Sequence, residues 1–235
     1  MIDIAAAVAS ALAEVRGRVQ EAARAAGRDP AEVTLIAVSK AQPLERLQAA
    51  LDAGQRTFGE NYVQEFLGKR QDYDLPDIRW HYIGRLQTNK VRQIVGQVHR
   101  IHSVDRTKLA REISKRSVKA DLTSDILVQV NVGEEESKGG ISADDAEREL
   151  AAILELPNLD VHGLMCIPPF GSPEEVRPYF VQLREVRDRL EPALGIKLPE
   201  LSMGMSGDYE TAIAEGATLV RVGSAIFGAR LYRQG

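Results

Sequence analysis

Short apolar runs rich in β-branched residues alternate with helical stretches along almost the whole chain, and this alternation constrains the fold more than any other feature. The eight strand-like runs are, in order, VTLIAVSK, RTFGE, IRWHYIG, VHRIHSVD, SDILVQVNV, LDVHGLMCI, ELSMGM and TLVRVGSAIFG. Helical stretches follow the first seven runs, at residues 43–53, 61–73, 88–96, 106–120, 142–154, 172–190 and 208–216. Strands joined through helices of this length pair in parallel through βαβ crossovers. We therefore expect an α/β fold built on a parallel sheet.

Eight such units within roughly 200 residues favour a closed (β/α)8 barrel, a TIM barrel, over an open sheet. We expect a single domain over residues 1–235, with the barrel at residues 33–228. Residues 1–28 are expected to form an extra N-terminal helix that closes the bottom of the barrel. The alternative is an open doubly wound sheet, which would favour a G-x-G-x-x-G turn after the first strand. The sequence there is VSKAQPLERL, which has no such turn.

Charge, cysteine content and apolar run length disfavour several classes of protein. A net charge of −4 argues against a dedicated nucleic-acid binder, which carries a basic surplus. Cys166 is the only cysteine, which fits a reducing compartment. The alanine-rich N-terminus is interrupted by Asp3 and Glu14 and lacks the basic segment of a signal peptide. No run approaches the eighteen or so apolar residues of a membrane span. We expect a cytoplasmic protein with no nucleic-acid or membrane partner.

Residues at the C-terminal ends of barrel strands face the active site of this fold. Lys40 ends the first strand, and the loops after the last two strands carry SMGMSGD and VGSAIFG. Ser206 and Gly207 precede a helix N-terminus, which favours anions, and Gly223 and Ser224 end the eighth strand. These loops are the frequent phosphate site of TIM barrels. Ordinary Gly/Ser turns are the alternative interpretation; Asp208 is assigned to helix capping.

A lysine and a phosphate site on one rim suggest pyridoxal 5′-phosphate (PLP) held as a Schiff base. A lysine at the end of a buried strand is partly desolvated, which lowers its pKa and makes its amine nucleophilic. The alternative is a flanking Lys40 whose amine reaches solvent. Arg221 interrupts the apolar run LVRVG and needs a partner there, either a carboxylate in the barrel or a cofactor atom. If Arg221 donates to the pyridine nitrogen, that nitrogen stays unprotonated and the ring is a weaker electron sink.

An ordered set of motifs resembles the pyridoxal-phosphate homeostasis protein family. These motifs are AVSK, FGENYVQE, WHYIGRLQTNK, IHSVD, VNVGEEESKGG, GLMCIPP, LSMGMSGDYETAI and VRVGSAIFG. The resemblance covers nearly the whole chain and implies a single-domain barrel related to the N-terminal domain of bacterial alanine racemase. It also implies a cofactor site in which Lys40 is the Schiff-base lysine and Arg221 is the partner of the pyridine nitrogen. In this site Ser206, Gly223 and Ser224 hold the phosphate, together with the N–H of Gly207. Asn61 lies near the cofactor ring, and Met203 packs against the ring.

Three functions remain open, and the resemblance favours the first. It is a carrier or buffer that binds PLP reversibly in vitamin B6 and amino-acid homeostasis, passes it to apo-enzymes, and has no established catalytic activity. The second is a slow PLP-dependent amino-acid racemase, which needs acid/base groups on both faces of the substrate. In alanine racemase a second, β-rich domain supplies the other group, a tyrosine, and we expect no such domain here. Tyr62 and Tyr82 are the tyrosines near the rim. The third is an aldolase that forms its Schiff base with a phosphorylated sugar.

Several other features are weighed against plain structural roles. His99 and His102, three residues apart on a strand, face opposite sides, so no metal site is expected. Lys138 is a candidate second landing point for PLP. Lys90 and Arg92 form either a basic patch for a partner protein or a solvated helix face. Since the dimer contacts of the racemase depend largely on its second domain, we expect a monomer.

Overall fold

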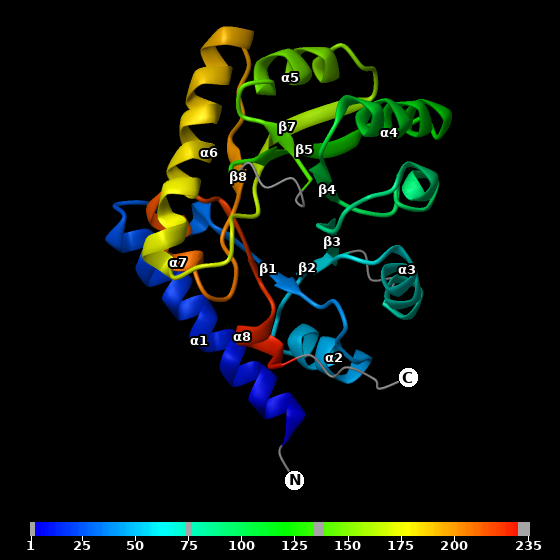
Figure 1. Ribbon diagram of the computed structural model, residues 1–235. Coiled ribbons are helices and arrows are strands. Elements are labelled where there is room, and N and C mark those ends of the chain that lie inside the picture. Colours follow the sequence, from blue (N-terminus) through cyan, green and yellow to red (C-terminus); the bar gives the residue numbers. More distant parts are fainter. Residues whose placement is uncertain (1–2, 74–76, 134–138, 230–235) are drawn as a thin grey trace.

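The computed structural model describes residues 3–73, 77–133 and 139–229. Eight parallel strands of this described part close into a barrel (Figure 1). They are β1 (Thr34–Val38), β2 (Thr57–Glu60), β3 (Arg79–Tyr82), β4 (Arg100–Val104), β5 (Ser124–Asn131), β7 (Leu159–Met165), β8 (Glu200–Ser202) and β9 (Leu219–Val222). Each strand pairs with the next along the chain, and the β9–β1 pairing closes the ring. The predicted single-domain TIM barrel is confirmed, and the open sheet is excluded.

Helices cover the outside of this barrel. They are α2 (Leu44–Asp52), α3 (Val63–Asp72), η2 (Thr88–Gln93), α4 (Thr107–Lys119), α5 (Ala146–Leu154), α6 (Pro173–Leu194) and α7 (Tyr209–Ala214), with α8 (Ser224–Phe227) after the last strand. The sequence sets several of their ends. Ser172 and Glu175 form a reciprocal capping box at the start of α6, and Gly195 ends this helix in the left-handed conformation.

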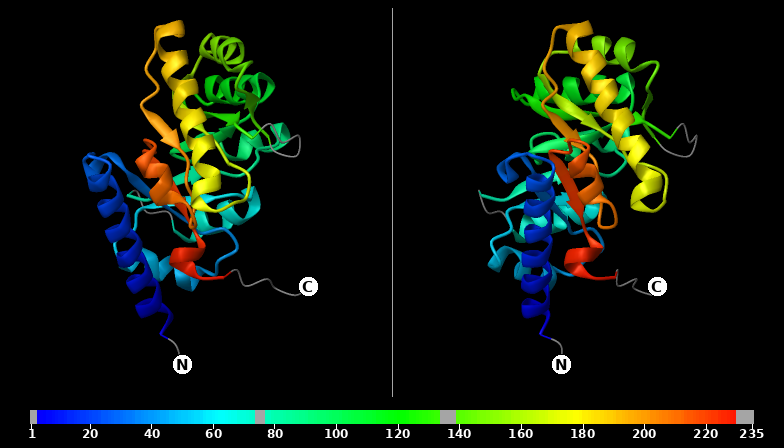
Figure 2. Two further views of the ribbon diagram at one scale, coloured as in Figure 1. Left: turned by 60° about the vertical axis from the view of Figure 1, so that its left-hand side comes forward. Right: turned by 90° about the vertical axis from the view of Figure 1, so that its left-hand side faces the viewer.

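The N-terminal helix α1 (Ile4–Ala25) lies along the side of the barrel. Asp3 caps it by accepting hydrogen bonds from the backbone N–H groups of Ala5 and Ala6. Its buried stripe, Val8, Leu12, Val15, Val19 and Ala23, has helical spacing. The helix packs against α2, α7 and α8, outside the ring of strands (Figures 1 and 2). The prediction that it closes the bottom of the barrel is therefore wrong: it stands between α7 and α2 in the outer layer, and a short turn, η1 (Pro30–Glu32), leads from it to β1.

Three element boundaries also differ from the sequence prediction. The helix expected at residues 88–96 is the short 3-10 helix η2. The helix expected from Ser142 begins at Ala146, because Ile141–Ser142 forms a short strand, β6, that pairs with the end of β5. The eighth predicted strand ends at Val222, and the apolar residues after Gly223 turn into α8.

The core divides into two regions. A large apolar cluster fills the space between the strands and the outer helices. Inside the barrel, Ile36, Leu127, Met165 and Leu219 form a smaller apolar cluster. The barrel also contains buried polar side chains, among them His81, His102, Ser202 and Arg221. Among the described residues, no helix is both long enough and apolar enough to span a membrane.

Candidate functional site

A cavity of about 370 Å³ opens at the C-terminal ends of β1 and β9, and we call it the cofactor cavity. It brings together seven of the eight predicted site residues: Lys40, Asn61, Ser206, Gly207, Arg221, Gly223 and Ser224. The eighth, Met203, is fully buried in the core and does not line the cavity, whereas its neighbour Met205 does. The mouth of the cofactor cavity carries the exposed side chains of Ile167 and Phe170. Lys138 lies outside the described residues.

Lys40 is held in a tight turn after β1. The next residue, Ala41, has a positive φ of 56°, a conformation that costs free energy and that is often found at functional sites. The Ala41 N–H donates to Glu65 Oε1 at 2.6 Å, and the Gln42 N–H donates to the Ser39 carbonyl oxygen at 3.1 Å. These bonds fix the backbone on both sides of the lysine.

The buried ammonium of Lys69 stabilises this turn through hydrogen bonds. Its Nζ donates to the Ser39 carbonyl oxygen at 2.5 Å, to Glu60 Oε1 at 2.7 Å and to Glu65 Oε1 at 2.6 Å. Ser39 Oγ also donates to Glu60 Oε1, at 2.6 Å. Burial raises the pKa of Glu60, and the Lys69 ammonium and the Ser39 hydroxyl oppose that rise. The sequence analysis did not single out this group, although Glu65 and Lys69 show the i,i+4 spacing of a helical ion pair.

Ser206 joins the two loops predicted to hold phosphate. Its Oγ accepts hydrogen bonds from the N–H of Gly223, at 3.1 Å, and of Ala225, at 3.3 Å. The hydroxyl hydrogen remains for a further acceptor. Asp208 occupies the N-cap position of α7 but makes no side-chain cap bond; its Oδ1 instead accepts from the Met205 N–H at 2.5 Å. The predicted capping role of Asp208 is therefore corrected to that of closing the turn.

Arg221 is buried in the barrel wall, and the two groups that accept its hydrogen bonds carry no charge. Nη1 donates to Ser202 Oγ at 2.7 Å, and Nη2 donates to the Cys166 carbonyl oxygen at 2.8 Å. Burial lowers the pKa of Arg221, but a guanidinium stays charged at neutral pH. A charge in this position is costly unless it meets an acceptor, and the guanidinium borders the cofactor cavity. Cys166 itself is fully buried, and burial raises the pKa of its thiol to about 12, so it is unreactive.

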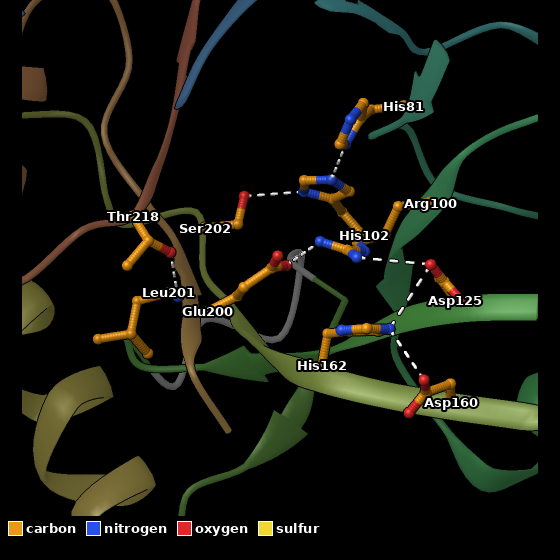
Figure 3. A network of polar contacts seen from close by, with 10 residues as sticks. All are labelled: His81, Arg100, His102, Asp125, Asp160, His162, Glu200, Leu201, Ser202 and Thr218. Carbon is orange, nitrogen blue, oxygen red and sulfur yellow. Dashed lines mark hydrogen bonds and ion pairs between the residues drawn. The ribbon is translucent and has the colours of Figure 1, made fainter. Parts of the chain in front are cut away.

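A line of hydrogen bonds runs from Arg221 into the barrel, and Figure 3 shows its inner part, from Ser202 to His81. His102 Nδ1 lies 2.8 Å from Ser202 Oγ, and His102 Nε2 lies 2.8 Å from His81 Nδ1. Burial lowers the pKa of both imidazoles well below the ordinary 6.5, so both are neutral at pH 7. With Arg221 donating to Ser202, the Ser202 hydroxyl can donate to His102, and His102 to His81. These hydrogen bonds hold the Arg221 guanidinium from the barrel interior.

A separate polar group lies near the N-terminal ends of the strands (Figure 3). His162 Nε2 lies 3.2 Å from Asp160 Oδ2 and 3.5 Å from Asp125 Oδ2. Arg100 pairs with Asp125 and with Glu200. Since the cofactor cavity opens at the other ends of the strands, this group belongs to the structural wall of the barrel.

Asn61 is placed by a close approach of two strand ends. A Cβ added to Gly84 would lie 2.2 Å from the Asn61 carbonyl oxygen, so only glycine permits this contact. Tyr82 Oη donates to the same oxygen at 3.0 Å. Asn61 Oδ1 is buried without a hydrogen-bond partner among the described residues. The side chain therefore offers an acceptor beside the cavity that holds Lys40.

The cavity fits a molecule that combines an aldehyde, a planar ring and a phosphate. A primary amine, a buried guanidinium without a carboxylate partner among the described residues, and a Ser/Gly loop pair surround one small space. Apart from that of Met203, each predicted role has a matching group in the wall of this cavity. The described residues thus fit PLP as a cofactor.

Known proteins are similar to this chain in sequence and in fold. Residues 11–231 match the family model "Alanine racemase, N-terminal domain". A pyridoxal phosphate homeostasis protein of Aquifex aeolicus is 49% identical over 94% of this chain and 97% of its own length. One from Pseudomonas aeruginosa is 46% identical, with 96% of each chain covered. The solved structure of PipY from Synechococcus elongatus with PLP bound is 38% identical, with a TM-score of 0.84 over 94% of this chain and all of PipY. Alanine racemase from Corynebacterium glutamicum shares the fold. It is 15% identical, with a TM-score of 0.71 over 94% of this chain and 62% of the racemase chain.

Fold and site together define a barrel of the alanine racemase N-terminal type. Within that class, the identity and coverage of its relatives establish that this chain belongs to the pyridoxal phosphate homeostasis protein family.

Proposed function

We propose that this protein binds PLP as a Schiff base on Lys40 and acts as a PLP carrier or buffer in the cell. The observation that carries the proposal is the convergence of Lys40, Arg221 and Ser206 on one cavity. The names of the relatives and the PLP-bound structure of PipY support the choice of cofactor. When bound, PLP supplies an aldehyde carbon for a lysine amine and a ring that can accept electrons.

The chain's own groups divide the work of holding this molecule. The turn around Lys40 directs the amine. Ser206 and Ser224 offer hydroxyl donors to the phosphate and Gly207 offers its N–H, while the Gly223 N–H holds the Ser206 hydroxyl in place. Arg221, held by Ser202, donates to the pyridine nitrogen and keeps a proton off it. Asn61 borders the ring. Met203 has no direct part in this proposal, because its side chain lies in the core.

A carrier is favoured over the slow racemase by the surroundings of the two rim tyrosines. Tyr62 and Tyr82 line the neighbouring groove and not the cofactor cavity. The Tyr82 hydroxyl donates to Asn61, and burial raises its pKa to about 12, which makes it a poor proton donor or acceptor at pH 7. Arg221 at the ring nitrogen also weakens the electron sink that racemisation needs. The aldolase is favoured by no further observation. Apo-enzymes as PLP recipients, a monomeric state and a cytoplasmic location complete the proposal.

The test is a visible absorption spectrum of the purified protein with PLP, before and after borohydride reduction, followed by peptide mapping. We expect a Schiff-base band that reduction converts into a stable adduct on Lys40. Lys40→Ala should lose the band, and Lys119→Ala, which removes an exposed lysine on α4, should keep it. Adducts scattered over surface lysines, or no band at all, would refute the proposal. Solvent deuterium incorporated at the α-carbon of an amino acid, dependent on Lys40, would instead favour the racemase.

A further inference from the structure

A second, larger cavity of about 820 Å³ lies beside the cofactor cavity, and Asn61 lines both. It is bounded by the loops after β2 and β3 and by the start of α4. We call it the basic groove, defined by Arg85, Gln87, Asn89, Lys90 and Arg106. Its volume lies within the range of small-molecule sites. Nothing in the proposed PLP site uses these residues.

Two of the three cations of the basic groove, Arg85 and Lys90, have no acidic partner among the described residues. Arg106 pairs with Asp105. Arg85 and Lys90 make no side-chain hydrogen bond or ion pair with the described residues; Arg85 is exposed and Lys90 is half-buried. No aspartate or glutamate stands among the described residues of its wall. Positive groups lining one concavity raise the local concentration of anions.

The remaining wall of the groove is rich in hydrogen-bonding side chains. Gln87, Asn89 and Gln64 offer amide donors and acceptors, and Thr88 offers a hydroxyl. The exposed ring of Tyr62 adds a flat surface at the same wall. Exposed lysines and arginines on a helix face are ordinarily solvated and bind nothing specific. Here the cations converge on a cavity with amides between them, which is the composition of a site for a polar anion.

We propose that the basic groove binds a small phosphate monoester whose organic part carries hydroxyl groups, as in a sugar phosphate. Arg85 and Lys90 hold the phosphate, because a guanidinium and an ammonium together match its charge and its acceptor oxygens. Arg106, already paired with Asp105, contributes less. The amides hydrogen-bond the hydroxyl groups. The shared residue Asn61 makes this site a direct neighbour of the cofactor cavity.

The first experiment titrates the full-length, isotope-labelled protein with glucose 6-phosphate, with glucose and with inorganic phosphate, and follows backbone amide resonances. We expect glucose 6-phosphate to shift the amides of residues 85–90 and to bind more weakly as salt rises. Arg85→Ala combined with Lys90→Ala should weaken this binding at least ten-fold. The matched control, Arg111→Ala with Lys115→Ala, removes two exposed cations from α4 and should leave it unchanged.

Several results would overturn this assignment. One is that glucose 6-phosphate shifts only amides of the cofactor cavity. Another is that the control variant loses as much affinity for glucose 6-phosphate as the Arg85→Ala, Lys90→Ala variant does. A third is that glucose, which lacks the phosphate, shifts the amides of residues 85–90 equally. Binding of inorganic phosphate as tightly as of glucose 6-phosphate would remove the organic part from the proposal. Binding of an acidic peptide without binding of the monoester would assign the groove to a protein partner instead.

The outcome is independent of the proposed PLP function. Arg85→Ala with Lys90→Ala should retain the absorption band of the Schiff base on Lys40, because neither side chain lines the cofactor cavity. If the wild-type protein forms no such band, the PLP proposal fails while the groove titration still reads out. If the band forms and residues 85–90 do not respond, only the groove proposal fails.

Discussion

The Ser206 hydroxyl makes the sharpest prediction at the scale of single residues. Its oxygen accepts from the Gly223 and Ala225 N–H groups, so its hydrogen points to a remaining acceptor, which we take to be the phosphate of PLP. A hydrogen bond to a charged group is worth about 1.5–3 kcal/mol, so Ser206→Ala should weaken PLP binding roughly 10- to 100-fold. An absorbance titration with PLP measures this. Ser10→Ala, on the exposed face of α1, is the control. Equal affinity of Ser206→Ala and wild type would exclude Ser206 from the phosphate site.

Lys69 is the second residue on which the site depends. Lys69→Met leaves Glu60 buried without its cation, and breaking a buried pair in this way costs about 3–5 kcal/mol. Urea unfolding should show that loss, and adding Glu60→Gln should recover much of it because the buried charge is then gone. Lys119→Met, at an exposed position, should change stability by less than about 0.5 kcal/mol. A Lys69→Met protein as stable as wild type would contradict the role assigned to this ion pair.

The sequence predicted the residues that line the cofactor cavity better than the residues that hold those side chains in place. Lys40, Ser206 and Arg221 were found because a parallel barrel gathers strand ends on one face, so position along the chain is enough. Met203 was assigned to the ring by the resemblance, but the structure buries it in the core and brings Met205 to the cavity wall. Gly204 between them has a φ of 92°, a turn that breaks the strand alternation from which sides are inferred. The Ser202–His102 contact joins residues 100 positions apart, and no local pattern encodes it.

At the scale of elements, the close contact between the ends of β2 and β3 is the feature most sensitive to substitution. Gly84→Ala would place a Cβ 2.2 Å from the backbone oxygen of Asn61, so the two strand ends must separate. We expect lower stability in urea unfolding and weaker PLP binding, because Asn61 moves with its backbone. Gly68→Ala is the control: its Cβ meets nothing within 4 Å, and alanine in a helix interior stabilises by about 0.5–1 kcal/mol. Equal behaviour of the two variants would refute the packing argument.

The boundary that the sequence missed after the last strand has a clear cause. The run LVRVGSAIF is mostly apolar on both sides of Gly223, and a short apolar run does not distinguish a strand from a buried helix. The structure divides it at Gly223 into β9 and α8. Likewise, α1 has a regular apolar stripe, but the stripe alone does not say which surface it covers. Its place between α7 and α2 depends on the closure of the whole ring.

At the scale of the whole molecule, the barrel holds two neutral histidines that set its tolerance of acid. His81 and His102 are buried and bonded to each other, and burial keeps the pKa of each well below 6.5. In the unfolded chain both bind protons as pH falls below about 6.5, whereas in the folded protein they do not. Stability therefore falls with falling pH in this window, by up to about 1.4 kcal/mol per pH unit for each histidine.

Urea unfolding between pH 7 and pH 5 measures this dependence. His81→Gln should reduce the slope by up to about 1.4 kcal/mol per pH unit, because one of the two titrating groups is gone from the unfolded chain. If that variant does not fold, the wild-type imidazole resonances give the same information: those of His81 and His102 should not titrate between pH 7 and pH 5.5. Titration of either resonance near 6.5 would mean that the barrel interior admits a charged imidazole. The line from His81 to Arg221 would then change its proton arrangement at the pH where PLP binding is measured, and Arg221 would lose the fixed support that keeps its guanidinium at the cofactor cavity.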